Sequence, residues 1–254
     1  MLLIDKLSYR SKLRYVNASE KLMYAVLTLI LCILSRSVRV AALVFVINGI
    51  LIVGKGGIPL SRYVKLLMIP LAFLIVGTAA IVVNVSKVPL DAFAFRLGEW
   101  YITGSMAGIY RALELCATAL SAVTCLYFLS LNTVMTDILD ALRKLHFPSL
   151  LIELMLLIYR FIFVLFQTAS AITVSQQARL GNRDFKTRIR SFGAMGSELF
   201  ILALKRSNVL YDAMESRCYD GNIRVLTRMQ PPRAGEIAVI AAIELILVLV
   251  WICG

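Results

Sequence analysis

The stretch Leu66–Val83, LLMIPLAFLIVGTAAIVV, decides the fold class because it is eighteen residues long and carries no charge. A transmembrane helix needs about 20 mostly apolar residues, with about 17 as the lower limit. Five other stretches are also rich in apolar residues: Leu22–Leu34, Val40–Val53, Gly104–Leu131, Leu150–Ala171 and Ile237–Ile252. The first two of these reach spanning length only with their flanks, and Arg36 and Arg39 between them indicate a short hairpin. We therefore expect an all-α, polytopic membrane protein.

The composition of the whole chain agrees with this expectation. Of its 254 residues, 60% are hydrophobic and 17% are charged, whereas soluble domains average about 45–50% apolar and 25% charged residues. An ordinary soluble domain is excluded, and so is a disordered chain, which would be poor in apolar residues. The 27 Lys and Arg residues against 15 Asp and Glu residues give a net charge of +12. In a membrane protein such an excess indicates cytoplasmic loops rather than nucleic-acid binding.

The distribution of the basic residues predicts the orientation of the chain. The amino terminus and the loop after the second span are basic, so both should be cytoplasmic. Ser86–Thr103 has balanced charges and contains the pair Trp100-Tyr101, which is typical of an outer loop at an aromatic belt. If Leu150–Ala171 spanned the membrane, the strongly basic stretch Thr173–Gly235 would lie outside. We therefore expect Leu150–Ala171, which contains Glu153 and Arg160, to stay on the inner side.

The predicted organisation has five spans. Residues 1–131 should hold the first four transmembrane helices, residues 132–235 a cytoplasmic coupling lobe of long helices, and residues 236–254 the last transmembrane helix. The amino terminus and the lobe should face the cytoplasm of a prokaryote, with the protein in the inner membrane.

Two long helices of this lobe are each predicted to end with an arginine followed by a glycine. One helix should run from Ser149 to Arg179 before Gly181, and the other from Ser197 toward Arg217. A left-handed cap is easiest at a glycine such as Gly181. A cation in the last turn interacts favourably with the helix dipole and stabilises the helix by about 0.3–1 kcal/mol. The spacing alone favours this stabilising role for both arginines. Alternatively, each helix tip enters a groove of a partner, where the guanidinium binds a carboxylate or a carbonyl.

Several segments together resemble one protein family. They are Ile4–Leu22, Met135–Leu139, Leu157–Phe161, Gln177–Gly181 and Ala213–Arg217. These segments resemble those of cobalt-type energy-coupling factor T components (CbiQ-like proteins), over residue 4 to about residue 226. Such proteins are transmembrane scaffolds of vitamin and metal importers, and they join a substrate-binding membrane subunit to a pair of ATP-binding cassette subunits.

The resemblance implies roles for two groups of three residues, each of which would dock on one ATPase: Ala178, Arg179, Leu180 and Ser216, Arg217, Cys218. It also implies that the partner ATPases bind ATP and Mg, that the partner substrate subunit binds cobalt or nickel, and that this chain holds no cofactor. Two positions depart from the family pattern. Cys218 stands where glycine is usual, and Asn132-Thr133-Val134 replaces Thr-Thr-Pro, which should loosen the turn after the fourth span.

Three charged residues lie within the predicted spans. Arg111 and Glu114 share one face of the fourth span, and Glu244 lies in the middle of the last one. Charges in the membrane are functional candidates, but no relay of acids and histidines continues from these three. We expect a structural pair of Arg111 with Glu114 or Glu244. The alternative is a self-sufficient secondary transporter that uses all three residues.

Catalytic and metal-binding patterns are absent from the sequence. It has no GxxxxGK[ST] phosphate-binding motif. Its single histidine, His146, lies in a predicted turn, so no Ser/His/Asp or Cys/His arrangement can be built. Cobalt or nickel would need several imidazole, thiolate or carboxylate ligands, and no such cluster is visible. We therefore expect a non-catalytic chain without a metal site, whereas a membrane enzyme would need a catalytic constellation at the inner face.

Overall fold

The computed structural model describes residues 3–82, 84–86, 93–97, 100–221, 223, 231 and 233–252. Contacts divide the chain into two compact units. The membrane unit comprises Leu2–Ile138 and Arg228–Gly254, and the hairpin unit comprises Leu139–Thr227. The sequence predicts that the chain leaves the membrane after residue 131 and enters it again after residue 235, and these two limits stay predictions.

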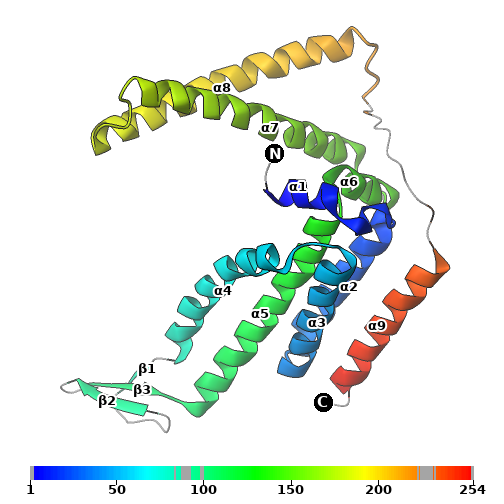
Figure 1. Cartoon of the computed structure of the whole chain (residues 1–254), viewed down its shortest axis with the longest axis vertical. Helices are drawn as coiled ribbons and strands as arrows, with labels where there is room; N and C mark the ends of the chain where they lie inside the picture. Colours follow the sequence, from blue (N-terminus) through cyan, green and yellow to red (C-terminus); the bar gives the residue numbers. More distant parts are fainter. Residues whose placement is uncertain are drawn as a thin grey trace. The chain divides into compact units, whose positions relative to one another are not determined.

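The membrane unit is built around one long helix, α5 (Met106–Asn132). Its other elements are α1 (Leu3–Arg10), the 3-10 helix η1 (Lys12–Tyr15), α2 (Ala18–Ser35), α3 (Val38–Ile50), the π-helix η2 (Leu51–Lys55), α4 (Leu60–Val82) and α9 (Ala234–Ile252). Helix α5 packs against α1, α2, α3 and α4, while α9 packs against α2 and α3 (Figure 1). As predicted, a short turn at Arg36 separates the first two long helices.

The segment between α4 and α5 forms a small antiparallel sheet. Its strands are β1 (Asn84–Ser86), β2 (Phe93–Leu97) and β3 (Trp100–Gly104), in the order β1-β3-β2. Asn84 pairs with Thr103, and Phe93 pairs with Gly104. The stretch that the charge pattern predicts as an outer loop thus contains strands, and the side of the membrane on which it lies stays a prediction.

The hairpin unit contains two long helices, α7 (Ser149–Ala178) and α8 (Phe185–Glu215), which pack against each other (Figure 1). The shorter α6 (Met135–Lys144) precedes them. Helix α8 begins at Phe185, whereas the apolar pattern predicted that it begins at Ser197. Phe185, Ile189 and Phe192 recur at helical spacing and extend the helix backward, although glycines follow at 193 and 196.

Among the residues that the structure describes, six helices are long and apolar enough to cross a membrane: α2, the Val38–Lys55 segment, α4, α5, α7 and α9. Five of them belong to the membrane unit, and α7 belongs to the hairpin unit. The expected helical, polytopic membrane protein is confirmed. Whether α7 also crosses the membrane stays a prediction.

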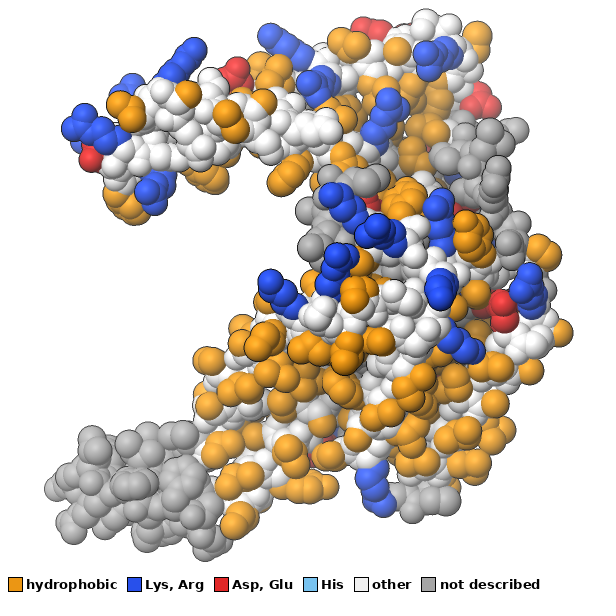
Figure 2. Space-filling model, viewed as in Figure 1, with side chains coloured by type: hydrophobic (Ala, Val, Ile, Leu, Met, Phe, Trp, Pro, Cys, Tyr) orange, Lys and Arg blue, Asp and Glu red, His pale blue; other side chains and the backbone are white. Residues whose placement is uncertain are grey.

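The surface of the membrane unit is apolar over much of its helices (Figure 2). On α4, Met68, Ile69, Phe73 and Val76 are each more than three-fifths exposed. Such a contiguous apolar surface is rare on a soluble monomer and is typical of a surface that faces lipid.

A buried polar cluster holds the end of α5. The ammonium of Lys21, which is 3% exposed, donates to the carbonyls of Leu13 (3.0 Å) and Asn132 (2.9 Å). The hydroxyl of Ser11 donates to Asn132 Oδ1 at 2.7 Å. A Cβ added at Gly56 would lie 2.6 Å from the same oxygen, so only glycine fits there. These hydrogen bonds and the close approach of Gly56 hold the exit from α5, which the sequence predicts to be loose.

Candidate functional site

The first predicted docking end closes α7. Leu180 adopts the left-handed conformation with φ 57°, and Arg179 directly precedes it. The amide of Leu180 donates to the Gln177 carbonyl (3.1 Å), and the amide of Gly181 donates to the Gln176 carbonyl (2.7 Å). These two hydrogen bonds and the left-handed residue define a Schellman motif.

The second predicted docking end closes α8 in the same way. Cys218 has φ 57°, and Arg217 directly precedes it. The amide of Cys218 donates to the Glu215 carbonyl (2.9 Å), and the amide of Tyr219 donates to the Met214 carbonyl (3.1 Å). Arg179 and Arg217 therefore occupy the same position in two copies of one local structure.

The left-handed residue of the first end is Leu180 and not Gly181, where the sequence predicted it. Gly181 is needed for a different reason, because a Cβ there would lie 2.8 Å from the Gln176 carbonyl oxygen and 2.9 Å from Ser191 Oγ. Ser191 Oγ donates to the Gly181 carbonyl, and Gln176 Nε2 donates to the Ser191 carbonyl, both at 2.9 Å. The absence of a side chain at Gly181 thus lets the first turns of α8 pack against the end of α7.

All six residues of the predicted docking ends are exposed: Ala178, Arg179, Leu180, Ser216, Arg217 and Cys218. Within the part of the chain that the structure describes, neither arginine side chain has an ion pair or a hydrogen bond. Backbone amides already satisfy the last carbonyls of both helices, so the guanidinium groups are not needed for that purpose. Their donors are available to a partner.

The second end is tied to the start of α7 by a residue whose role the sequence did not reveal. The buried carboxylate of Glu153 accepts hydrogen bonds from Tyr219 Oη (2.5 Å) and from the amide of Ile223 (3.1 Å). The hydrogen bond to Glu153 raises the pKa of Tyr219. The isolated acid in an apolar run was the only available signal, and its partner is 66 residues away in the sequence.

A groove of about 430 Å³ lies beside Arg217 in the hairpin unit. Arg160 of α7 also lines it, together with Asp220 and several apolar side chains. A second groove, of about 360 Å³, is lined by Arg160, Lys205 and Arg206. These cationic side chains make the surface near the second end suitable for a partner that carries carboxylates.

The two docking ends lie at opposite ends of the α7–α8 pair (Figure 1). Helix α7 has 30 residues and α8 has 31, so each helix is about 45 Å long at 1.5 Å per residue. Two separate partner proteins can therefore contact the two ends at the same time.

The charges of the predicted spans are not brought into an ion pair. The ion pairs of the described residues include Asp140–Arg143, Arg183–Asp184 and Arg233–Glu236, and within these residues Arg111, Glu114 and Glu244 form none. Glu244 Oε1 is buried and has no hydrogen-bond partner among the described residues. A structural pairing of these residues stays a prediction. In the described ranges, no three His, Cys, Asp or Glu side chains group into a possible metal site.

Comparison with known proteins gives one consistent result. The family model described as cobalt transport protein, CbiQ, matches residues 9–229. An uncharacterized protein of Methanocaldococcus jannaschii is 31% identical, over 97% of this chain and 91% of its own. The cobalt transport protein CbiQ of Salmonella typhimurium is 28% identical, over 87% of this chain and 99% of its own. The energy-coupling factor transporter transmembrane protein EcfT of Staphylococcus aureus is 27% identical, over 86% of this chain and 83% of its own.

Proposed function

This chain belongs to the CbiQ family of cobalt transport proteins, and on that premise we propose that it is the coupling subunit of an ATP-driven importer of the energy-coupling factor class. It is a membrane component of a cobalt transporter, with nickel as the other candidate metal. In the proposed complex, two ATP-binding cassette subunits bind ATP and Mg, and a separate membrane subunit binds the metal. This chain then transmits the movement of the ATPases to the metal-binding subunit and performs no catalytic step itself.

The observation that carries this proposal is the equivalence of the two helix ends. Arg179 and Arg217 precede left-handed residues with the same φ, and both are exposed. Two equivalent ends suit two related partners, one at each end. When the two ATPases close on ATP, they would displace both ends, and the rigid α7 and α8 would carry this displacement to the rest of the complex.

The two possible roles of the arginines differ in magnitude. As exposed dipole partners, each arginine stabilises its helix by at most about 1 kcal/mol. As docking residues, each forms charge-assisted hydrogen bonds worth about 1.5–3 kcal/mol. The loss of such bonds weakens binding by roughly 10- to 150-fold per site.

The test is the double variant Arg179→Ala, Arg217→Ala, co-expressed with the two ATPases and the metal-binding subunit. We expect it to insert into the membrane normally, to co-purify poorly with the ATPases and to lose ATP-driven cobalt uptake. Lysine at both positions should restore function only in part, because it keeps the charge but not the planar donor fork.

The matched control is Arg183→Ala, which removes an exposed arginine just beyond the first end. Arg183 pairs with Asp184 at 3.5 Å and lies outside both docking ends, so this variant should assemble like the parent. If the double variant assembles and transports like the parent, the two ends are ordinary helix caps and the coupling role is wrong.

A second test separates this function from that of a secondary transporter. The purified chain alone should bind neither cobalt nor nickel with micromolar affinity in calorimetry, because the metal is proposed to bind to the partner subunit. Tight binding by the chain, or uptake into liposomes that contain this chain alone under an ion gradient, would favour the transporter that uses Arg111, Glu114 and Glu244.

A further inference from the structure

A small pocket in the membrane unit has no part in the docking proposal. Its volume is about 160 Å³, and it lies between η1, α2, η2, α5 and α9. Most of its lining is apolar: Leu13, Val16, Leu51, Val239, Ile240 and Ile243. The rings of Tyr24 and Phe128 also line it and contact each other edge to face, with their centroids 5.0 Å apart. Glu20 and Glu236 are its acidic residues, and Lys21 and Lys55 are its basic ones.

Glu20 is the unusual residue of this pocket. It is 5% exposed, and among the described residues no atom is in hydrogen-bonding geometry with either of its carboxylate oxygens, although the carboxyl group of Glu236 and the backbone amide of Arg233 lie close to it. The neighbouring Lys21 does not neutralise it, because the Lys21 ammonium is bound by two backbone carbonyls. Burying an unpaired carboxylate is costly, and buried polar groups in native proteins nearly always have partners. The orphaned acceptors of Glu20 therefore indicate a cationic donor that enters the pocket.

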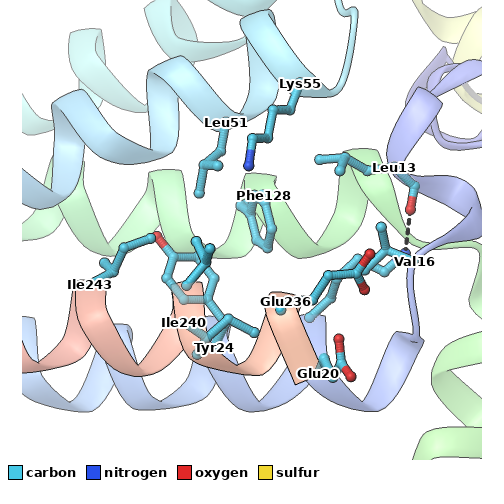
Figure 3. Close-up of a pocket in the computed structure, with 13 residues that line it drawn as sticks. Leu13, Val16, Glu20, Tyr24, Leu51, Lys55, Phe128, Glu236, Ile240 and Ile243 are labelled. Atoms are coloured by element: carbon cyan, nitrogen blue, oxygen red, sulfur yellow. Dashed lines mark hydrogen bonds between the residues drawn. The ribbon is translucent and has the colours of Figure 1, made fainter. Parts of the chain in front are cut away.

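The other charged groups of the pocket indicate which further chemical group the ligand carries besides the cationic donor. Glu236, which also pairs with Arg233 at 3.9 Å, lies beside Glu20, and the amine of Lys55 extends from η2 toward the Phe128 ring (Figure 3). The pocket thus offers carboxylates on one side, a lysine on another and an aromatic ring between them. An ammonium group fits the carboxylates and the ring, and an anionic group fits the lysine.

The size of the pocket limits the ligand to a small group. Pockets for drug-sized molecules measure about 300–1,000 Å³, so about 160 Å³ accommodates a headgroup and excludes a large organic cofactor. The position of the pocket is equally informative. It lies at the start of α2, the end of η2 and the start of α9, which the charge bias places at the cytoplasmic face of the membrane. Lipid headgroups occupy this level.

We propose that this pocket binds the headgroup of an aminophospholipid, with the ammonium at Glu20 and Glu236 and the phosphate at Lys55. The apolar residues Val239, Ile240 and Ile243 on α9 continue the pocket in the direction of the bilayer core and provide contacts for the acyl chains. The bound lipid supplies an ammonium donor to Glu20, whose carboxylate oxygens have no donor in hydrogen-bonding geometry among the described residues.

The experiment measures lipid retention by the purified full chain in detergent, by native mass spectrometry with added dioleoylphosphatidylethanolamine or dioleoylphosphatidylglycerol. We expect phosphatidylethanolamine to bind about tenfold more tightly, because only its headgroup carries the ammonium. Glu20→Gln should abolish this preference. Lys55→Ala should weaken the binding of both lipids, since both contain the phosphate. Glu198→Gln and Lys65→Ala, which change exposed residues outside the pocket, should leave lipid binding unchanged.

Three results would overturn the proposal. One is equal binding of the two lipids by the parent chain. Another is a Glu20→Gln variant that remains folded and keeps the preference for phosphatidylethanolamine. The third is full competition by soluble phosphoethanolamine, which would assign the pocket to a free metabolite. If Glu20→Gln does not fold, Lys55→Ala still decides the matter, because Lys55 is exposed at the rim and its unchanged lipid binding would contradict the phosphate contact.

Discussion

Leu180 and Cys218 both adopt a left-handed backbone conformation, although neither is glycine. For a residue with a Cβ this conformation costs about 1–2 kcal/mol. Cys218 stands where the resemblance implies a glycine, and glycine reaches positive φ without a steric penalty.

This conformation gives a prediction for Cys218→Gly. We expect the variant to be more stable by up to about 1 kcal/mol, because relief of the strain exceeds the extra freedom that glycine has in the unfolded chain. Equilibrium unfolding in detergent measures the change. Ser216→Gly is the control, since Ser216 has φ −62° and glycine there should lower the stability by about 0.5–1 kcal/mol. A destabilised Cys218→Gly variant would contradict the assigned strain.

Gly181 gives the opposite prediction. An added Cβ would lie within 3 Å of the Gln176 carbonyl oxygen and of Ser191 Oγ, and such overpacking costs about 1–3 kcal/mol. Gly181→Ala should therefore destabilise the hairpin unit by this amount. Gly193→Ala is the matched control, because nothing lies within 4 Å of its Cβ position and alanine favours a helix by up to about 1 kcal/mol. Equal effects of the two substitutions would contradict the close packing at Gly181.

The sequence indicates where α7 and α8 end, but not the backbone conformation of these two ends. The sequence contains a glycine just after Arg179, and glycine is the usual left-handed residue at a helix end. The structure places Leu180 in that conformation instead, because Gly181 is required for the close contact with Ser191 of α8. That contact depends on how two helices pack, and local sequence does not reveal it.

At the scale of elements, the hydrogen bond between Glu153 and Tyr219 links the start of α7 to the end of α8. If this link holds the second docking end, Glu153→Gln and Tyr219→Phe should each lower the stability of the protein. The double variant should lose less than the sum of the two single losses, because both remove the same hydrogen bond. Unfolding measurements on the four proteins give the coupling energy.

The control for this double-mutant cycle is Tyr211→Phe, which removes the hydroxyl of a tyrosine that is 60% exposed. It should have little effect alone and should be additive with Glu153→Gln. Additive effects of Glu153→Gln and Tyr219→Phe would mean that the two residues act independently.

Hydropathy predicts the positions of most helices, and its failures have physical causes. The first turns of α8 were missed because Lys186, Arg188 and Arg190 lower the local hydropathy, although Phe185 and Ile189 keep the helical spacing. The sheet between α4 and α5 was missed because the pairing of Asn84 with Thr103 joins residues that are far apart in the sequence. Backbone pairing of this kind leaves no periodic hydropathy signal in strands of three to five residues.

At the scale of the whole molecule, hydropathy cannot decide whether α7 crosses the membrane. Its most apolar window has a mean hydropathy of 2.3, the same value as that of α4. The charged residues Glu153 and Arg160 within α7 and the basic residues that follow it distinguish the two helices, the latter through the expectation that such residues stay in the cytoplasm. The five-span topology therefore depends on charge and not on apolar length.

The native cysteines allow a test of this topology. Cys218 is exposed and unpaired, whereas Cys32 and Cys125 are buried. With five spans, a membrane-impermeant maleimide should label Cys218 in inside-out vesicles and not in intact cells. Cys218→Ser provides the background signal. Labelling of Cys218 from outside intact cells would mean that α7 crosses the membrane and that the orientation of the hairpin unit is reversed.

Both docking ends are closed by backbone hydrogen bonds, and this has an evolutionary consequence. The amides at positions 180, 181, 218 and 219 satisfy the helix carbonyls whatever side chains the arginine positions carry. Mutations at Arg179 or Arg217 can therefore accumulate without unfolding either helix. If the proposed ATPase partners are encoded by duplicated and diverged genes, each end could coevolve with its own paralogue while the scaffold stays constant.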